Sequence, residues 1–185
     1  MIRPLVGALF VLAGSIVPVL GAGLPDKADI FLIDGEGKET ELGSVTFSGA
    51  EGNKTIAVSI ESPAFTDQFL SMRPFRCIQS KKEWFCYLPY PYEIKNEISA
   101  DDLTDLEYHL LFLRKKPAEF GIDAWNGLYY NLTLQENGQI TGELLEGDLN
   151  VLASPPEKAF SRPIDLDDFI EAEEGKRLFP SLIIR

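Results

Sequence analysis

Apolar and polar residues alternate along much of this chain. The clearest alternation runs through residues 54–61, where apolar side chains, most of them branched, occupy every second position. Because successive side chains of an extended strand point to opposite faces, this pattern predicts a β-strand with one buried face. Residues 128–135 alternate in the same way, and the Asn137-Gly138 pair that follows is typical of a hairpin turn. We therefore expect an antiparallel sheet.

Shorter stretches extend this expected sheet. Further strands are predicted at residues 29–34, 42–48, 140–145, 148–152 and 179–184. The proline in the last stretch favours an edge position. Residues 63–70 start with a proline and are compatible with a helical turn, and the acidic residues 166–171 predict another. Seven to nine short strands indicate a mostly β fold, a single antiparallel barrel or sandwich with one or two short helical turns.

The segment from residue 99 to residue 117 fits two structures. Its leucines recur at helical spacing, but residues 106–112 also alternate as a strand would. A short apolar run cannot be assigned from its period alone. We favour a helical turn at residues 100–104, because Ser99 and Asp102 have the spacing of a capping box, followed by a buried strand at residues 106–114.

A second hairpin is predicted at residues 72–92, which hold both cysteines of the chain. Cys77 lies on one arm and Cys86 on the other, with a polar tip at residues 80–83. Residues that lie opposite each other in an antiparallel pair have Cβ atoms close enough for a disulfide. We therefore expect these two cysteines to be bonded, since their spacing does not fit a CxxC metal or redox site.

Residues 1–22 have the layout of a secretory signal peptide. A short cationic start precedes an apolar run, which Pro18 breaks before a group of small residues. A membrane anchor is the alternative, but the run is short and acidic residues follow it. We expect cleavage near Ala22, which leaves residues 23–185 as a single β-rich exported domain with no transmembrane segment. Its location is periplasmic in a Gram-negative bacterium and extracellular otherwise.

The formal net charge of −12 narrows the classes of partner. An acidic chain repels nucleic acid and anionic membrane surfaces, so we expect neither. The sequence contains no nucleophile–base motif, no phosphate loop and no metal-ligand spacing, which indicates no cofactor, no metal and no catalytic residues. His109 is the sole histidine and has no evident catalytic partner. The acidic clusters at residues 101–107 and 165–171 lack the calcium-loop pattern and fit helix caps better.

Three motifs between residues 72 and 131 carry a resemblance. Pro-Tyr-Pro-Tyr begins at Pro89, Asp-Leu-Thr-Asp-Leu-Glu-Tyr at Asp102, and Trp-Asn-Gly-Leu-Tyr-Tyr at Trp125. In these motifs the chain resembles an uncharacterised family of exported alphaproteobacterial proteins of unknown function. The resemblance implies a bacterial periplasmic protein, and it transfers no activity and no site residue.

Both tryptophans and all six tyrosines lie between Trp84 and Tyr130. Most of these rings must belong to the core of a domain of this size. Four of them lie in or beside predicted loops and are candidate contacts for a ligand or partner: Tyr90, Tyr92, Trp125 and Tyr129. The alternative for Trp125 is that it fills the end of the barrel as a core residue.

The function expected from the sequence is that of an exported non-enzymatic β-domain, which binds a protein, peptide or envelope component. One alternative is a β-barrel that carries a small apolar ligand in its interior. A carboxylate-dependent hydrolase is a less favoured alternative. An interior cavity would favour the carrier, and a close carboxylate pair in a cleft would favour the hydrolase.

Overall fold

The computed structural model describes residues 24–50, 52–173 and 175–185, so the predicted signal peptide lies outside the described residues. Within them, twelve strands form one sheet with antiparallel pairing throughout. The strands are β1 (Lys27–Ile33), β2 (Glu39–Ser48), β3 (Lys54–Ile60), β4 (Thr66–Leu70), β5 (Arg73–Gln79), β6 (Trp84–Tyr87), β7 (Glu97–Ile98), β8 (Phe112–Lys115), β9 (Gly127–Leu134), β10 (Ile140–Gly147), β11 (Ile170–Glu171) and β12 (Ser181–Ile184). The helical elements are α1 (Thr104–Glu107) and the 3-10 turns η1 (Ala124–Asn126), η2 (Asn150–Ala153) and η3 (Leu166–Asp168).

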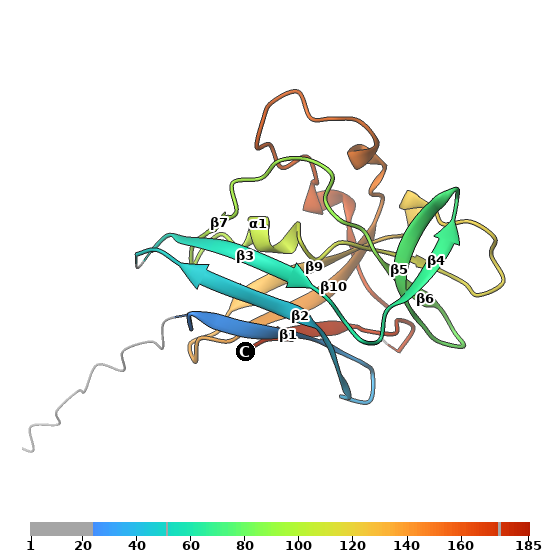
Figure 1. Cartoon of the computed structure of the whole chain (residues 1–185), viewed down its shortest axis with the longest axis horizontal. Coiled ribbons are helices and arrows are strands. Elements are labelled where there is room, and N and C mark those ends of the chain that lie inside the picture. The colour runs from blue at the N-terminus through green and yellow to red at the C-terminus, as the bar shows by residue number, and fades with distance from the viewer. Residues whose placement is uncertain (1–23, 51, 174) are drawn as a thin grey trace, which may run out of the picture.

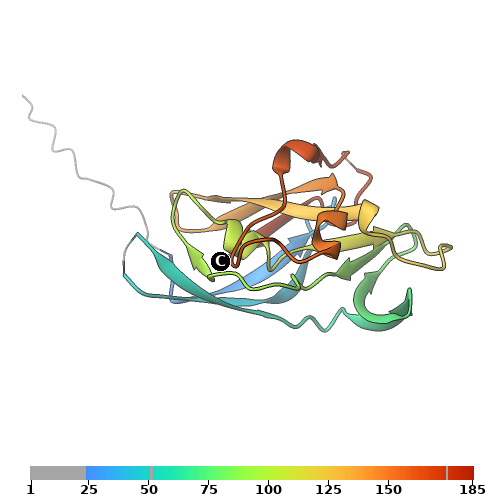
Figure 2. The same cartoon turned by 90° about the horizontal axis from the view of Figure 1, so that it is seen from above.

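The sheet bends over itself around a buried core. Its strands follow the order β4, β5, β6, β8, β9, β10, β12, β1, β2, β3 and β7, with β11 paired to β10. Strands β2 and β3 form one layer and β9 and β10 the other (Figures 1 and 2). Apolar side chains from both layers form one buried cluster, in which the ring centroid of Phe85 lies 4.3 Å from that of Phe112 and 5.3 Å from that of Phe179.

A second buried cluster lies on the other face of β8 and β9. In β9, Tyr130 belongs to the first cluster and its neighbour Tyr129 to the second, as the alternation of a strand requires. Tyr108, Leu149 and Leu152 also belong to the second cluster. The long segment that follows β10 arches over this side of the molecule (Figure 1), so both faces of β9 are covered.

Helix α1 contacts both β7, at one end of the sheet, and β9. Strand β9 pairs with β8 over only two residues, so most of that edge of β9 has no partner among the strands that the structure describes. The buried carboxylate of Glu107 reaches this edge: Oε1 accepts the backbone N–H of Leu132 at 2.8 Å, and Oε2 accepts the hydroxyl of Tyr129. Glu107 therefore satisfies a buried backbone donor that would otherwise need a further strand.

The mostly β antiparallel fold is confirmed, but two details of the prediction are wrong. The sheet has twelve strands rather than seven to nine, and it is not closed, because β4 and β7 lie at its two ends and do not pair. Strands β7 and β11 have two residues each, which is too short for a period to be visible in the sequence. No helix in the described ranges is long and apolar enough to span a membrane.

Several local predictions need correction. Residues 66–70 form strand β4 rather than a helical turn, because their backbone pairs with β5 along its length. Residues 150–153 form the 3-10 turn η2 where a strand was expected. Strand β12 lies between β10 and β1 and not at an edge. The proline expected to mark that edge, Pro180, precedes the strand, and its carbonyl accepts the N–H of Leu144 at 3.1 Å.

The ambiguous segment contains a helical turn followed by a strand, in the predicted order but with shifted bounds. The helix covers Thr104–Glu107 rather than residues 100–104, and the strand covers Phe112–Lys115 rather than residues 106–114. The N-cap position is Leu103, which has no capping side chain, so the predicted capping box at Ser99 is wrong; Asp102 Oδ1 accepts the N–H of Thr104 at 3.1 Å just before the helix. The leucines that fit the helical spacing and those that fit the strand alternation are all buried, which is why the period of this segment was ambiguous.

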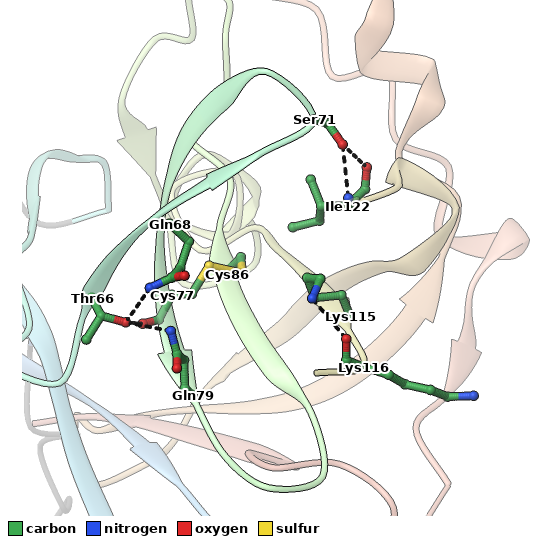
Figure 3. Close-up of a disulfide and its surroundings, with 9 residues drawn as sticks. All are labelled: Thr66, Gln68, Ser71, Cys77, Gln79, Cys86, Lys115, Lys116 and Ile122. Carbon is green, nitrogen blue, oxygen red and sulfur yellow. Dashed lines mark hydrogen bonds between the residues drawn. A yellow bond between two sulfur atoms is a disulfide. The ribbon is translucent and has the colours of Figure 1, made fainter. Parts of the chain in front are cut away.

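The predicted disulfide is confirmed. Cys77 and Cys86 are directly opposite each other on β5 and β6, and their sulfur atoms are bonded. Figure 3 shows this bond between the two strands. Both residues are fully buried, with Leu70, Phe75 and Trp84 packed around them. The bond therefore ties together the two strands at the position where their pairing begins.

Removing this disulfide should lower stability moderately. The closed loop is short, so the Cys77→Ser variant should lose about 2–3 kcal/mol of unfolding free energy, measured by urea denaturation at equilibrium. Wild-type protein treated with reductant should show a loss of similar size. Two reactive thiols in unreduced, freshly purified exported protein would contradict the pairing.

Candidate binding groove

A groove opens where β5 and β6 diverge. The two strands pair only from Cys77 to Gln79 on β5, whereas the earlier half of β5 pairs with β4 alone. Between that half of β5 and the chain that leaves β6 lies a hollow of about 670 Å³. It is lined by residues from four segments, 71–76, 87–92, 122–124 and 149–153, and by Leu113 of β8. A volume of this size is typical of ligand and peptide sites.

Hydrogen bonds fix the two sides of the groove to each other. Ser71 Oγ donates to the carbonyl of Ile122 at 3.2 Å and accepts the N–H of Ile122 at 3.0 Å (Figure 3). These two bonds connect the tip of the β4–β5 hairpin to the loop that precedes β9. The hairpin tip and the loop thus form one continuous surface, although they are far apart in the sequence.

The turn η1 is held against the loop after β10. The N–H of Leu149 donates to the carbonyl of Ala124 at 2.9 Å. A Cβ at Gly127 would lie 2.5 Å from Leu149 Cγ and 2.6 Å from the carbonyl oxygen of Gly147, so only glycine allows this close approach. The wall formed by residues 122–124 is therefore rigidly placed.

The structure brings Tyr90 and Tyr92 together, with ring centroids 5.6 Å apart, and leaves both partly exposed. Tyr92 lines the groove, and its hydroxyl donates to the carbonyl of Leu152 at 2.8 Å. Tyr90 lines an adjoining hollow, and its hydroxyl donates to the carbonyl of Ser161 at 3.2 Å. Both hydroxyls are thus used to hold the long segment after β10, which leaves mainly ring surface for a partner.

Trp125 is exposed over 68% of its surface, so it does not fill the end of a barrel. Its side chain lies outside the groove lining, but it directly follows Asp123 and Ala124, which are part of that lining. Asp123 accepts the backbone N–H of Trp125 at 3.1 Å and caps the turn. The backbone that carries the indole is therefore fixed directly after the groove lining.

Tyr129 does not share this surface. It is fully buried in the second cluster, its hydroxyl donates to Glu107, and its ring packs against Tyr108 and Phe169. The sequence placed it beside Trp125 because the two residues are close along the chain. Its side chain is buried because the segment after β10 covers the face of the sheet on which it lies.

Three exposed apolar side chains that are close in sequence to residues of the groove lining were not predicted as site residues. Phe69 and Met72 lie at the tip of the β4–β5 hairpin, and Phe120 precedes the wall loop. Met72 is 88% exposed and Phe120 is 100% exposed. Together with Trp125 we call these side chains the apolar rim, because each is close in sequence to a residue that lines the groove. Clustered exposed apolar residues mark interaction surfaces more often than scattered ones.

The hairpin tip has an unusual backbone. Leu70 and Arg73 are register partners, so Ser71 and Met72 form a two-residue turn. Both turn residues have positive φ angles, 48° and 66°, a conformation that normally selects glycine or asparagine. Such strain is found at functional sites more often than elsewhere. The two turn positions hold no Gly, Asn or Asp, so the sequence lacks the residues that usually mark such a turn.

The groove is cationic although the protein is acidic. Arg73 is exposed, and Arg76 lies within the lining, where its guanidinium donates to the carbonyl of Ile60 at 2.8 Å. The guanidinium carbon of Arg76 lies 5.2 Å from the ring centroids of both Phe65 and Tyr87. Burial raises the pKa of Tyr87, and the neighbouring Arg76 opposes that effect. Among the described residues of the lining, Asp123 is the one that is acidic, so the groove carries a local positive charge.

The other residues singled out for possible chemistry are engaged structurally. His109 Nε2 lies 2.7 Å from Asn96 Oδ1, and burial lowers the pKa of this histidine. Asp105 is buried and pairs with Arg162 at 2.6 Å. Asp165 accepts the N–H of Asp167 at 3.1 Å and caps η3. In the part of the chain that the structure describes, no group of three or more His, Cys, Asp or Glu side chains is placed to hold a metal ion.

What this arrangement can do chemically is bind. It offers an apolar groove, two guanidinium groups and a set of exposed rings on fixed segments. Comparison of the chain with protein-family models, with curated proteins and with solved structures gives no match. The groove itself is therefore the basis for assigning a function.

Proposed function

We propose that this protein is an exported, non-enzymatic domain that binds a protein partner through the groove and the apolar rim. The observation that carries the proposal is a preformed apolar groove together with four exposed large apolar side chains, each within two residues in sequence of a residue that lines the groove: Phe69, Met72, Phe120 and Trp125. Exposure of large apolar side chains to water is thermodynamically unfavourable, and a partner that covers them removes this cost.

The rigidity of the site supports this proposal. Association costs free energy when loops and side chains must become ordered. Here the hairpin tip is bonded to Ile122, the turn that carries Trp125 is capped by Asp123, and Tyr92 is held by Leu152. Much of this ordering is already complete in the free protein. Rigid aromatic groups near a groove are also frequent hot spots of protein interfaces.

The two alternatives have less support. A carrier of a small apolar ligand needs space between the layers, whereas that region holds closely packed rings such as Phe85 and Phe112. A hydrolase needs free carboxylates in a cleft. Both oxygens of Glu107 accept hydrogen bonds, and Asp105 is paired with Arg162. Surface recognition is therefore favoured.

Export is part of the proposal. The layout of residues 1–22 and the buried disulfide between Cys77 and Cys86 support it, since disulfides persist in oxidising compartments. The proposed compartment is the periplasm if the source is Gram-negative and the extracellular space otherwise.

Site-specific photocrosslinking tests both the proposed binding of a protein partner and the proposed export. Exported protein, whose intact mass should lack residues 1–22, carries a photoreactive phenylalanine at Phe120 or, as control, at Ile170. Ile170 is 70% exposed and lines none of the groove. A protein should be crosslinked from position 120 in the native envelope and not from position 170. Crosslinking to lipid alone, or equal crosslinking from both positions, would contradict the proposal.

A further inference from the structure

We infer that the groove receives an extended peptide segment in which apolar and acidic side chains alternate, and that this segment pairs with the free edge of β5. The inference rests on the proposed function, because it names the part of the protein partner that enters the groove. Three features carry it: backbone groups of β5 that, among the described strands, neither β4 nor β6 pairs with, the composition of the lining, and the sign of its charge.

The first feature is the backbone of β5. Because a two-residue turn joins β4 to β5, Leu70 and Arg73 form a hydrogen-bonded pair, and every second residue of β5 then bonds to β4. The side chain of Thr66 donates to the Cys77 carbonyl at 3.1 Å, in agreement with this alternation. The carbonyl of Pro74 and the N–H of Arg76 therefore point away from β4.

Strand β6 does not reach these two groups. Its pairing with β5 ends at Cys77 and Cys86, so Arg76 and Tyr87 are not register partners. Pro74 has no N–H and interrupts any continuation of the ladder. The carbonyl of Pro74 and the N–H of Arg76 thus face the groove. They are spaced so that one residue of a neighbouring strand can form a hydrogen bond with each of them. A peptide residue that pairs with both of them extends the sheet, which is a common mode of peptide recognition.

The second feature is the composition of the lining. Phe75 lines the side of β5, and Leu88, Pro89 and Pro91 line the opposite side, with Ile122 between the hairpin and the loop. Prolines fix their own backbone and offer apolar surface at little entropic cost. Side chains of an extended peptide point alternately in two directions, so apolar residues at every second position contact these walls.

The third feature is charge. Arg73 and Arg76 line the groove against a single acidic residue, Asp123, whereas the whole chain carries a formal charge of −12. An acidic segment is therefore attracted to the groove and repelled by the rest of the surface, which selects this site over others. No ion pair of Arg73 is found among the described residues, so its guanidinium is open to a carboxylate of the partner.

An unbiased library of displayed linear dodecapeptides, selected on the immobilised mature protein, tests the inference. Enriched peptides should alternate apolar residues with Asp or Glu. The Arg73→Glu variant should bind synthetic versions of them about tenfold or more weakly, since a charge-assisted hydrogen bond is lost and a repulsion is added. The matched variant Lys81→Glu makes the same charge change at the exposed tip between β5 and β6 and should bind as wild type does.

Backbone pairing has its own readout. N-methylation of one backbone amide at a time should weaken binding about tenfold only at the positions that contact β5, while methylation elsewhere has little effect. Arg73→Gln, with an unchanged thermal melting curve, separates loss of charge from loss of fold. Enrichment of basic or neutral peptides, no effect of Arg73→Glu, or no enriched peptide at all would overturn the inference. Rim-dependent crosslinking to a protein would still uphold the proposed function in each of these cases.

Discussion

Replacing Glu107 with alanine should lower the free energy of unfolding by about 3–5 kcal/mol. The substitution leaves the N–H of Leu132 and the hydroxyl of Tyr129 buried without their acceptor. Each unpaired buried donor costs about 1–3 kcal/mol, and the removed side chain leaves a cavity as well. Urea denaturation at equilibrium measures the loss, which is a large part of the total stability of a domain of this size.

Glu107→Gln is the matched control. Its carbonyl oxygen can accept the N–H of Leu132, and its amide can donate to the hydroxyl of Tyr129 once that hydroxyl rotates. The glutamine variant should therefore lose less than about 1 kcal/mol. An alanine variant as stable as the glutamine variant would show that Glu107 does not hold the edge of β9.

The same pair of proteins predicts a pH dependence. Burial raises the pKa of Glu107 above its ordinary value of 4.5, and the hydrogen bonds from Tyr129 and Leu132 oppose this only in part. The folded state therefore binds a proton at Glu107 more tightly than the unfolded state. The stability gained from protonation is fully present below about pH 4.5 and is lost as the pH rises through the raised pKa. The stability of wild type relative to Glu107→Gln should fall across that interval, and a constant difference would contradict the assignment.

Trp125→Ala should weaken capture of the partner at least about thirtyfold while leaving the fold intact. Hot-spot aromatic residues contribute about 2–4 kcal/mol to binding, which corresponds to such a factor or more. The indole is largely exposed, so its removal should change the free energy of unfolding by less than about 1 kcal/mol. Binding is measured with the partner identified by crosslinking, and stability by denaturation.

Ile170→Ala is the control for Trp125→Ala. Ile170 is exposed to nearly the same extent, 70% against 68%, but it lies on β11 and lines none of the groove. It should bind as wild type does. A loss of several kcal/mol of stability in Trp125→Ala, with capture by the folded fraction unchanged, would return Trp125 to a core role and remove it from the site.

Part of the fold was predictable because some of the pattern is local. Strand β3 and the β9–β10 hairpin were predicted from their alternation and from the Asn137-Gly138 turn. The disulfide was predictable because both cysteines lie in one hairpin, where opposite positions follow from the turn. Strand β4 was not predictable from its own sequence, since its conformation depends on pairing with β5.

The site was predicted only in part. Tyr92 lines the groove and Trp125 directly follows two residues of its lining, because prolines and a capped turn hold them at the surface. Tyr90 faces an adjoining hollow, and Tyr129 is buried. The apolar rim could not be found from the sequence because Met72 and Phe120 are far apart in the chain, and the bonds between Ser71 and Ile122 bring their segments together only in the folded protein.

The sequence by itself determined which positions of a strand share a face, where hairpins turn and which cysteines pair, since these depend on neighbouring residues. Where both faces of a strand are apolar, as in β9, the tertiary structure decided that both are buried. Tyr129 is a core residue because a segment distant in sequence covers it. Lys115 is also buried, with its ammonium 4.1 Å from the ring centroid of Trp84, although it lies between the basic residues Arg114 and Lys116. The groove also exists only in the tertiary structure, because it is the space left where β5 leaves β6 and turns toward β4.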